Sequence, residues 1–269
     1  MRSLPTRRFN RRTLEPFTET WLQKRGRTVD NILEVNAIQT FISQFHILEG
    51  VSLKVRRNAI TVMLGRNGAG KTTTLKSIIG LTPPREGTVV FEGKEIQGRR
   101  AYDIAAMGIG YVPEHRAIFN NLTVSENLKI AERKKGDLEA KEDFIFGLFP
   151  DLKRLIRLPG NHLSGGQQQM LAVARALVAD NKLLLIDEPS EGLAPILIEQ
   201  MMEAIRALSA TTTVLLVEQN FFMASRLAEY YYIIDDGRTA HEGKMVDLVQ
   251  DKELIHRTLG TAIKKGGQA

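Results

Sequence analysis

Eight consecutive residues combine glycines with one lysine and one threonine in a pattern suited to phosphate. They are Gly65, Arg66, Asn67, Gly68, Ala69, Gly70, Lys71 and Thr72, and Thr73 follows them. Glycines adopt backbone angles that are closed to other residues, so consecutive N–H groups in this segment can point inward around an anion. Lys71 supplies a positive charge for the outer phosphates of a nucleotide, and the Thr72 hydroxyl is suited to ligate Mg²⁺. The spacing therefore predicts a nucleotide phosphate site.

The segments on both sides of these residues can position them. Residues 60–64 form an apolar run of the right length for a buried strand, and residues 73–79 can continue as a helix. The motif G-x-x-x-x-G-K-T requires this order of strand, loop and helix, and the helix start adds a partial positive charge. The alternative, a glycine-rich turn that merely joins two elements, leaves the agreement of both flanks unexplained.

Two adjacent carboxylates, Asp187 and Glu188, follow a second apolar run at residues 183–186. This run fits a strand buried on both faces, and open α/β sheets bind ligands at the carboxyl ends of their strands. Asp187 is of the right type to hold Mg²⁺ beside Thr72, and Glu188 can accept a proton from a water molecule that attacks a phosphate. The alternative is an acidic pair that caps the following helix. The phosphate motif upstream favours the catalytic interpretation.

A serine and two glycines precede an expected helix at residues 170–178, shortly before the acidic strand. The segment reads Leu163, Ser164, Gly165, Gly166, Gln167. A hydroxyl and free N–H groups at a helix start form another anion site. The order of phosphate loop, LSGGQ segment and acidic strand resembles the ATP-binding-cassette (ABC) ATPases, over about residues 32–261.

The resemblance implies an α/β P-loop NTPase cassette with a mostly parallel core sheet, an antiparallel β subdomain and a small α-helical subdomain. It places the cassette at residues 31–263 and the helical subdomain at about 115–178, between an N-terminal extension (1–30) and a tail (264–269). ATP and Mg²⁺ are the implied cofactors. Two cassettes of this family pair head to tail, so Ser164, Gly165, Gly166 and Gln167 are expected to act in trans on ATP held by the opposing subunit.

Several positions depart from the general ABC pattern and narrow the resemblance. Ala194 stands where most cassettes carry an aspartate, Gln219 where a histidine is usual, and Glu114 where a glutamine is usual. The stretches SEGLAP and VEQN resemble the importer ATPases for branched-chain and other hydrophobic amino acids. Gln219 can donate through its amide but cannot take up a proton, whereas the Glu114 carboxylate can reach Mg²⁺ or its water but cannot donate. We therefore expect hydrolysis to rest chiefly on Glu188, with Lys71 and Gln219 also catalytic and Thr72, Asp187 and Glu114 near the metal.

The family stacks the adenine base on an aromatic residue upstream of the phosphate loop, and here Ile42 takes that position. Phe41 precedes it and Phe45 follows it, but adjacent residues of a strand face opposite sides. Phe41 is therefore expected in the core. A loop at residues 114–121 carries Ile118 and Phe119, which either anchor a membrane partner or pack beneath their own loop.

The resemblance implies an ATP-hydrolysing, peripheral subunit on the cytoplasmic face of the cell membrane. Its partners would be permease subunits, a second identical or different cassette and, indirectly, an external substrate-binding protein. Three alternatives stay open: the same role in a urea or short-amide importer, a non-transport soluble ABC ATPase, and a nucleotide-binding scaffold without turnover. The last alternative is suggested by the departures from the family pattern at Glu114, Ala194 and Gln219. It is opposed by the presence of Lys71, Asp187 and Glu188.

The charge of the chain is unevenly placed along its 269 residues. Residues 1–30 carry eight Lys or Arg against three acidic residues, which accounts for five of the six net positive charges. The rest of the chain is nearly neutral, so nucleic-acid binding gains no support. The basic segment is expected to be a solvated tail, with acidic-lipid contact around Trp21 or a misassigned start codon as alternatives. The chain has no cysteine, which excludes disulfides and thiolate metal sites.

Overall fold

The computed structural model describes residues 30–260. The tail at 264–269 and the basic N-terminal extension with Trp21, apart from Asp30, lie outside the described residues. None of the helices between residues 30 and 260 is both long and apolar enough to cross a membrane.

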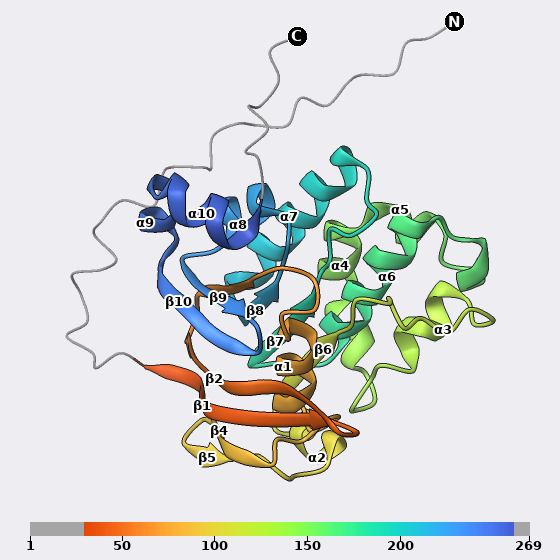
Figure 1. Ribbon diagram of the computed structural model, residues 1–269. Coiled ribbons are helices and arrows are strands. Elements are labelled where there is room, and N and C mark those ends of the chain that lie inside the picture. Colours follow the sequence, from red (N-terminus) through yellow and green to blue (C-terminus); the bar gives the residue numbers. More distant parts are fainter. Residues whose placement is uncertain (1–29, 261–269) are drawn as a thin grey trace, which may run out of the picture. The chain divides into compact units, whose positions relative to one another are not determined.

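A six-stranded sheet forms the centre of the described chain (Figure 1). Its strands β9, β3, β8, β7 and β6 run parallel in this order, and β10 pairs antiparallel with β9 at the edge. Their bounds are β3 (Ile60–Leu64), β6 (Ile109–Val112), β7 (Leu183–Asp187), β8 (Thr213–Val217), β9 (Tyr230–Asp235) and β10 (Arg238–Lys244). Every residue of β3, β7 and β8 is buried, as expected for central strands with both faces covered.

The two faces of this sheet belong to two separate cores. Along β7, Leu184 and Ile186 pack on one side, and Leu183 and Leu185 pack on the other. This alternation follows from the two-residue period of a strand. Helices with residues in the first core include α6 (Gly165–Val178), α7 (Pro195–Ser209), α8 (Phe221–Leu227), α9 (Met245–Gln250) and α10 (Lys252–Leu259), together with the short helices between β6 and α6 that are described below.

The second core lies between the central sheet and a smaller antiparallel sheet of order β2-β1-β4-β5. The elements here are β1 (Asn31–Ile42), β2 (Phe45–Arg56), β4 (Glu86–Phe91), β5 (Lys94–Glu95), α1 (Lys71–Ile78) and α2 (Ala101–Ala106). The hydroxyls of Thr40 on β1 and Ser77 on α1 share a buried hydrogen bond of 2.9 Å. This contact helps to fix the small sheet against the helix that follows the phosphate loop.

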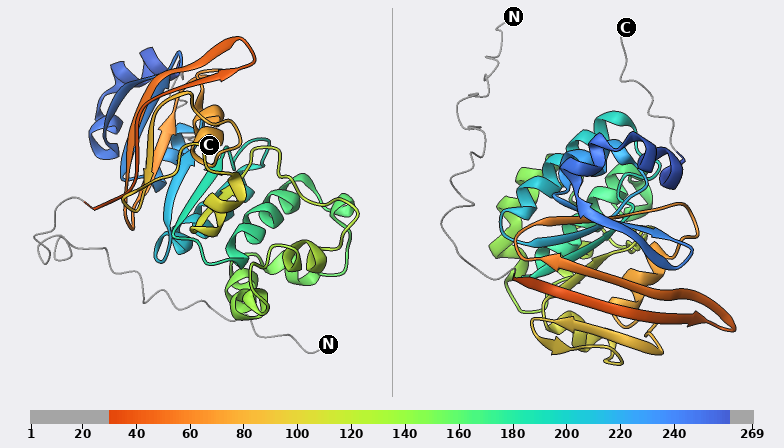
Figure 2. Two further views of the ribbon diagram at one scale, coloured as in Figure 1. Left: turned by 90° about the horizontal axis from the view of Figure 1, so that it is seen from below. Right: turned by 60° about the vertical axis from the view of Figure 1, so that its left-hand side comes forward.

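A group of short helices connects β6 to α6 and lies to one side of the central sheet, away from the small sheet (Figure 2). Its members are α3 (Val124–Lys129), α4 (Asp137–Leu148), α5 (Pro150–Arg154) and the short 3-10 helix η2 (Gly160–His162). Thr123 and Glu126 form a reciprocal cap at the start of α3. On α4, Ile145 and Phe146 are buried, whereas Phe144 is 40% exposed.

Candidate functional site

The predicted phosphate loop connects β3 to α1, which begins at Lys71. Gly65 has φ 152° and Gly70 has φ 103°, both in a region that disfavours other residues. A Cβ on Gly65 would lie 2.2 Å from the carbonyl oxygen of Ile234, and one on Gly70 would lie 2.7 Å from Leu48. The loop is therefore packed closely against β9 and β2, and both positions require glycine.

Lys71 is nearly completely buried at the start of α1, with 4% exposure. Its Nζ donates to the carbonyl oxygens of Gly65 and Arg66, both at 3.0 Å, and lies 3.4 Å from Oε1 of Glu188. These acceptors compensate the buried charge. Lys71 and Glu188, which stand far apart in the sequence, thus lie side by side at the loop.

Asp187, at the carboxyl end of β7, is fully buried. Its Oδ1 accepts a hydrogen bond from the Thr72 hydroxyl at 3.1 Å, and its Oδ2 accepts one from the Tyr111 hydroxyl at 3.3 Å. Burial raises the pKa of Asp187 to about 6, while these two hydrogen bonds lower it and the charges of Glu188 and Glu114 raise it further. The structure brings Thr72 and Asp187 together as the sequence predicts.

Glu188 follows β7 with φ 45°, an uncommon conformation for a residue other than glycine. Its side chain is largely buried, and Nε2 of Gln219 donates to its Oε2 at 2.6 Å. Its backbone N–H donates to the carbonyl oxygen of Val217 at 2.9 Å. Glu188 is therefore held by the loop that follows β8, a contact that the sequence does not show.

Glu114 lies in the loop after β6, where it is partly buried. Its charge contributes to raising the pKa of Asp187 and of Glu191, for both of which burial is the largest cause. It is thus near the acidic end of β7. The hydrogen bonds of Asp187 described above are donated by Thr72 and Tyr111. Glu114 is not a partner in either bond.

The LSGGQ segment forms the start of α6. The Ser164 hydroxyl accepts from the N–H of Gln167 at 3.3 Å, and Oε1 of Gln167 accepts from the N–H of Ser164 at 2.9 Å. The helix therefore begins at Gly165, earlier than the start at Met170 that the sequence suggests, because this reciprocal cap offsets the low helix propensity of glycine. Ser164 and Gly165 are exposed, so this helix start is open to a neighbouring molecule.

Three further residues near the site were not singled out from the sequence as site residues. Tyr111 holds Asp187, Glu218 joins the loops after β7 and β8, and Arg116 donates to Oε1 of Gln168 at 3.1 Å beside the LSGGQ segment. Burial raises the pKa of Glu218 to about 7, although hydrogen bonds from Ser190 and Asn220 oppose this shift.

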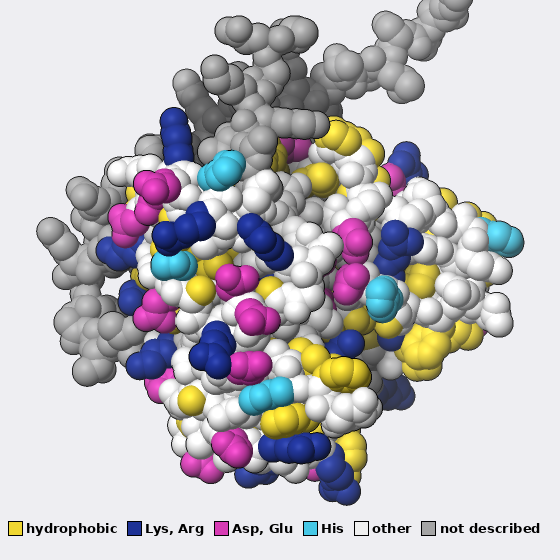
Figure 3. Space-filling model, in the orientation of Figure 1, with side chains coloured by type: hydrophobic (Ala, Val, Ile, Leu, Met, Phe, Trp, Pro, Cys, Tyr) yellow, Lys and Arg dark blue, Asp and Glu magenta, His cyan; other side chains and the backbone are white. Residues whose placement is uncertain are grey.

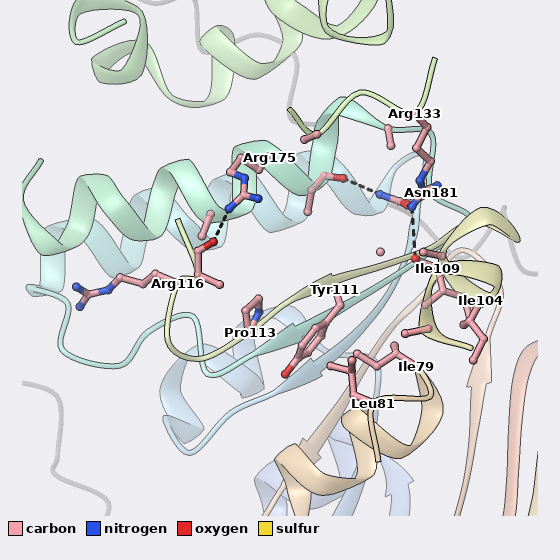
Figure 4. A pocket seen from close by; sticks show the side chains of 18 residues that line it. Ile79, Leu81, Ile104, Ile109, Tyr111, Pro113, Arg116, Arg133, Arg175 and Asn181 are labelled. Carbon is pink, nitrogen blue, oxygen red and sulfur yellow. Dashed lines mark hydrogen bonds between the residues drawn. The ribbon is translucent and has the colours of Figure 1, made fainter. Parts of the chain in front are cut away.

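A hollow of 340 Å³ lies between α6, β6 and the segment around α2 (Figure 4). Its wall combines apolar residues such as Ile104 and Ile109 with the guanidinium groups of Arg133 and Arg175. Arg133 donates to Oδ1 of Asn181 at 2.9 Å, while Nε of Arg175 is buried and has no hydrogen-bond partner among residues 30–260. The hollow therefore offers an apolar surface with positive charge at its edge.

The loop beside this hollow carries Ile118 and Phe119, which differ in packing and exposure. Ile118 packs against the first core, which supports self-packing. Phe119 is 45% exposed, and the guanidinium of Arg175 lies over its ring at 4.9 Å. A partner can therefore reach Phe119 more readily than Ile118.

The phosphate loop, the acidic strand and the capped LSGGQ helix occur together in a known protein family. The family described as "ABC transporter" matches residues 48–191. The chain belongs to this family. It is therefore an ABC-type ATPase, and cassettes of this kind bind ATP.

Relatives and solved structures agree with this family. A branched-chain amino acid transport ATP-binding protein of Pseudomonas aeruginosa, BraG, is 40% identical over 232 residues, covering 85% of this chain and all of BraG. The probable branched-chain amino acid transport ATP-binding protein LivF of Archaeoglobus fulgidus is 37% identical, covering 81% of this chain and 94% of LivF. A solved ATP-binding subunit of an ABC transporter has a TM-score of 0.72 at 28% identity, covering 85% of this chain and 96% of that one. The ABC resemblance and the fold class predicted from the sequence are confirmed.

Proposed function

We propose that the ABC cassette is the ATP-hydrolysing subunit of a membrane importer for branched-chain or other hydrophobic amino acids. The observation that carries this proposal is the 40% identity with BraG over the whole length of that protein. LivF, which is named for the same transport role, supports it. The SEGLAP and VEQN stretches agree with this subfamily.

The donor atoms at the end of β7 fit Mg²⁺. The Thr72 hydroxyl and the Asp187 carboxylate are adjacent oxygen ligands, and proteins usually hold Mg²⁺ by one or two carboxylates together with nucleotide phosphates. Among residues 30–260, no three His, Cys, Asp or Glu side chains come together as a metal site, and nucleotide phosphates and water would supply the other ligands. When bound, the ion neutralises charge on the outer phosphates. Glu114 is the further candidate, through a water ligand.

Nucleotide phosphates would lie in the cradle of residues 65–73, against the N–H groups at the start of α1. Lys71, now held by two loop carbonyls and Glu188, would turn toward the outer phosphates. In hydrolysis, the oxygen of a water molecule attacks the γ-phosphorus, the bond to the β-phosphate oxygen breaks, and ADP leaves. Glu188 accepts the proton that the water loses, and Gln219 orients the Glu188 carboxylate.

A second cassette, identical or different, would complete the site. The start of α6, where Ser164 and Gly165 are exposed, would contact the γ-phosphate of ATP bound to the partner through Ser164, Gly165, Gly166 and Gln167. On the face shown in Figure 3, Lys and Arg side chains are interspersed with Asp and Glu side chains. This mixed face supports protein partners in preference to nucleic acid.

The permease would contact the hollow beside β6, inserting a short apolar segment that carries an acidic residue for Arg133 or Arg175. This contact would place the chain on the cytoplasmic face of the cell membrane. The external substrate-binding protein would act through the permease alone.

Turnover and uptake together test the proposal. We expect Glu188→Gln to abolish phosphate release by the full chain with Mg-ATP while ATP binding persists. Near-normal turnover would show that Glu188 is not the base.

The transported substrate is tested by uptake. Disrupting the gene should abolish uptake of labelled leucine and leave urea uptake intact. Loss of urea uptake with normal leucine uptake would contradict the amino acid assignment. Proteins that co-purify in mild detergent should include permease subunits and a cassette.

A further inference from the structure

A further carboxylate near the site, that of Glu218, is buried with 1% exposure, and both of its oxygens accept hydrogen bonds. It directly follows β8. Its Oε1 accepts from the N–H of Ser190 at 3.1 Å, and its Oε2 accepts from the Ser190 hydroxyl at 2.9 Å and from the N–H of Asn220 at 3.1 Å. One side chain thus joins the loop after β7 to the loop after β8.

The two joined loops also carry the groups proposed to hydrolyse ATP. Ser190 stands two residues after Glu188, and Gln219 is the neighbour of Glu218. The hydrogen bond from Gln219 to Glu188 is a second link between the same loops. The N–H of Glu218 also donates to the carbonyl oxygen of Met63 at 3.1 Å, on the strand that leads into the phosphate loop.

We propose that Glu218 is a positioning residue for the proposed general base. By fixing the turn at Ser190, Glu218 holds Glu188 in its unfavourable backbone conformation, with φ 45°. By fixing Asn220, it sets the position of Gln219, so that the Gln219 amide reaches the Glu188 carboxylate. This inference rests on the proposed role of Glu188.

When Glu218 is ionised, both of its oxygens accept hydrogen bonds, so wild type and variant are compared above its raised pKa, at about pH 8. In Glu218→Gln, one oxygen becomes an NH₂ group of nearly the same size. Whichever way the amide turns, its NH₂ faces the backbone N–H of either Ser190 or Asn220, and neither of these can accept. The variant therefore disturbs the link between the loops with little change in volume.

Thr213 provides a matched control at the opposite end of the same strand. It is 1% exposed, and its hydroxyl accepts from the N–H of Asn58 at 2.9 Å. Thr213→Val also leaves a backbone N–H without its acceptor, but far along β8 from the proposed base. We expect both variants to lower the melting temperature, and only Glu218→Gln to impair turnover.

The experiment measures kcat and KM for ATP with the full chain and Mg-ATP. We expect Glu218→Gln to lower kcat by about tenfold or more with little change in KM. Glu218→Gln should lower kcat by a much smaller factor when Gln219→Ala is already present, because both changes act on the position of Glu188. Hydrogen exchange should accelerate at residues 188–194 and 218–220 in Glu218→Gln, and not in Thr213→Val.

Unchanged kcat in Glu218→Gln, a fall of equal size in Thr213→Val, or effects that add with those of Gln219→Ala would each overturn the inference. These results differ from failure of the proposed function. That failure would appear as a wild-type chain that does not bind or hydrolyse ATP, or as a Glu188→Gln variant that turns over normally.

Discussion

The hydroxyl of Tyr111 donates to Oδ2 of Asp187 at 3.3 Å, while Tyr111 also lines the hollow beside β6 (Figure 4). A single side chain thus separates the surface proposed to receive the permease from the carboxylate proposed to hold Mg²⁺. Burial raises the pKa of this tyrosine, so it stays protonated and acts as a donor.

Removing this donor should weaken the proposed metal site. Tyr111→Phe leaves the ring in place but takes one hydrogen bond from the buried Asp187 carboxylate, a loss of about 1 kcal/mol. We expect the Mg²⁺ concentration for half-maximal turnover to rise about fivefold. Tyr102→Phe is the matched control, because that tyrosine is 59% exposed on α2. Equal Mg²⁺ dependence in wild type and Tyr111→Phe would argue against the role of this contact.

Gln219 should contribute to turnover through its contact with Glu188. Gln219→Ala removes a donor that lies 2.6 Å from Oε2 of the proposed base, and leaves the contacts of Lys71 with Gly65 and Arg66 intact. We expect kcat to fall about tenfold, which corresponds to about 1.4 kcal/mol, while ATP binding stays close to that of wild type. Measuring both with the full chain separates the two effects. A variant with normal kcat would show that Glu188 needs no donor from this loop.

The register of the central sheet explains why some of these contacts escape sequence analysis. The phosphate loop, the acidic strand and their flanks are local patterns, so residues 65–72 and Asp187 could be placed from the sequence. The links from Gln219 to Glu188 and from Glu218 to Ser190 depend on the parallel pairing of Asp187 with Val217. This pairing brings together two loops that are separated by a whole crossover helix, α7, and no local spacing encodes it.

The burial of Glu218 should make stability depend on pH. Its pKa is raised from the ordinary 4.5 to about 7, so the native state holds this proton more tightly than the unfolded chain does. The stabilising contribution of Glu218 is therefore fully present below pH 4.5 and is lost as the pH rises through 7. At about 1.36 kcal/mol per pH unit, the loss is about 3 kcal/mol.

Denaturant unfolding between about pH 5 and about pH 8 measures this loss. Glu218→Gln cannot titrate, so its free energy of unfolding should fall less steeply over the same range than that of wild type. Parallel curves for the two proteins would show that Glu218 does not bind a proton more tightly in the folded state.

We expect an aromatic side chain at the tip of the β1–β2 hairpin to contact the adenine base. Phe41, expected in the core, instead stacks on His46 with ring centroids 4.1 Å apart, and Arg85 covers its ring. Its aromatic neighbour Phe45 is 63% exposed and pairs with Ile42 across the tip.

The pairing of β1 with β2 is irregular between Thr40 and Phe41, and Ile42 beyond this irregularity is 45% exposed whereas Thr40 is fully buried. We expect Phe45 to contact the base because it is an exposed aromatic side chain paired with Ile42, the position at which the family resemblance places the adenine contact. Aromatic stacking on a base contributes about 1–3 kcal/mol, so Phe45→Ala should raise KM for ATP by at least about fivefold with kcat little changed. Tyr102→Ala removes an exposed aromatic ring elsewhere and should leave KM as in wild type. An unchanged KM for ATP in Phe45→Ala would show that the base binds without a contact from the Phe45 ring. Phe41 would not replace it, because its ring already contacts His46 and Arg85.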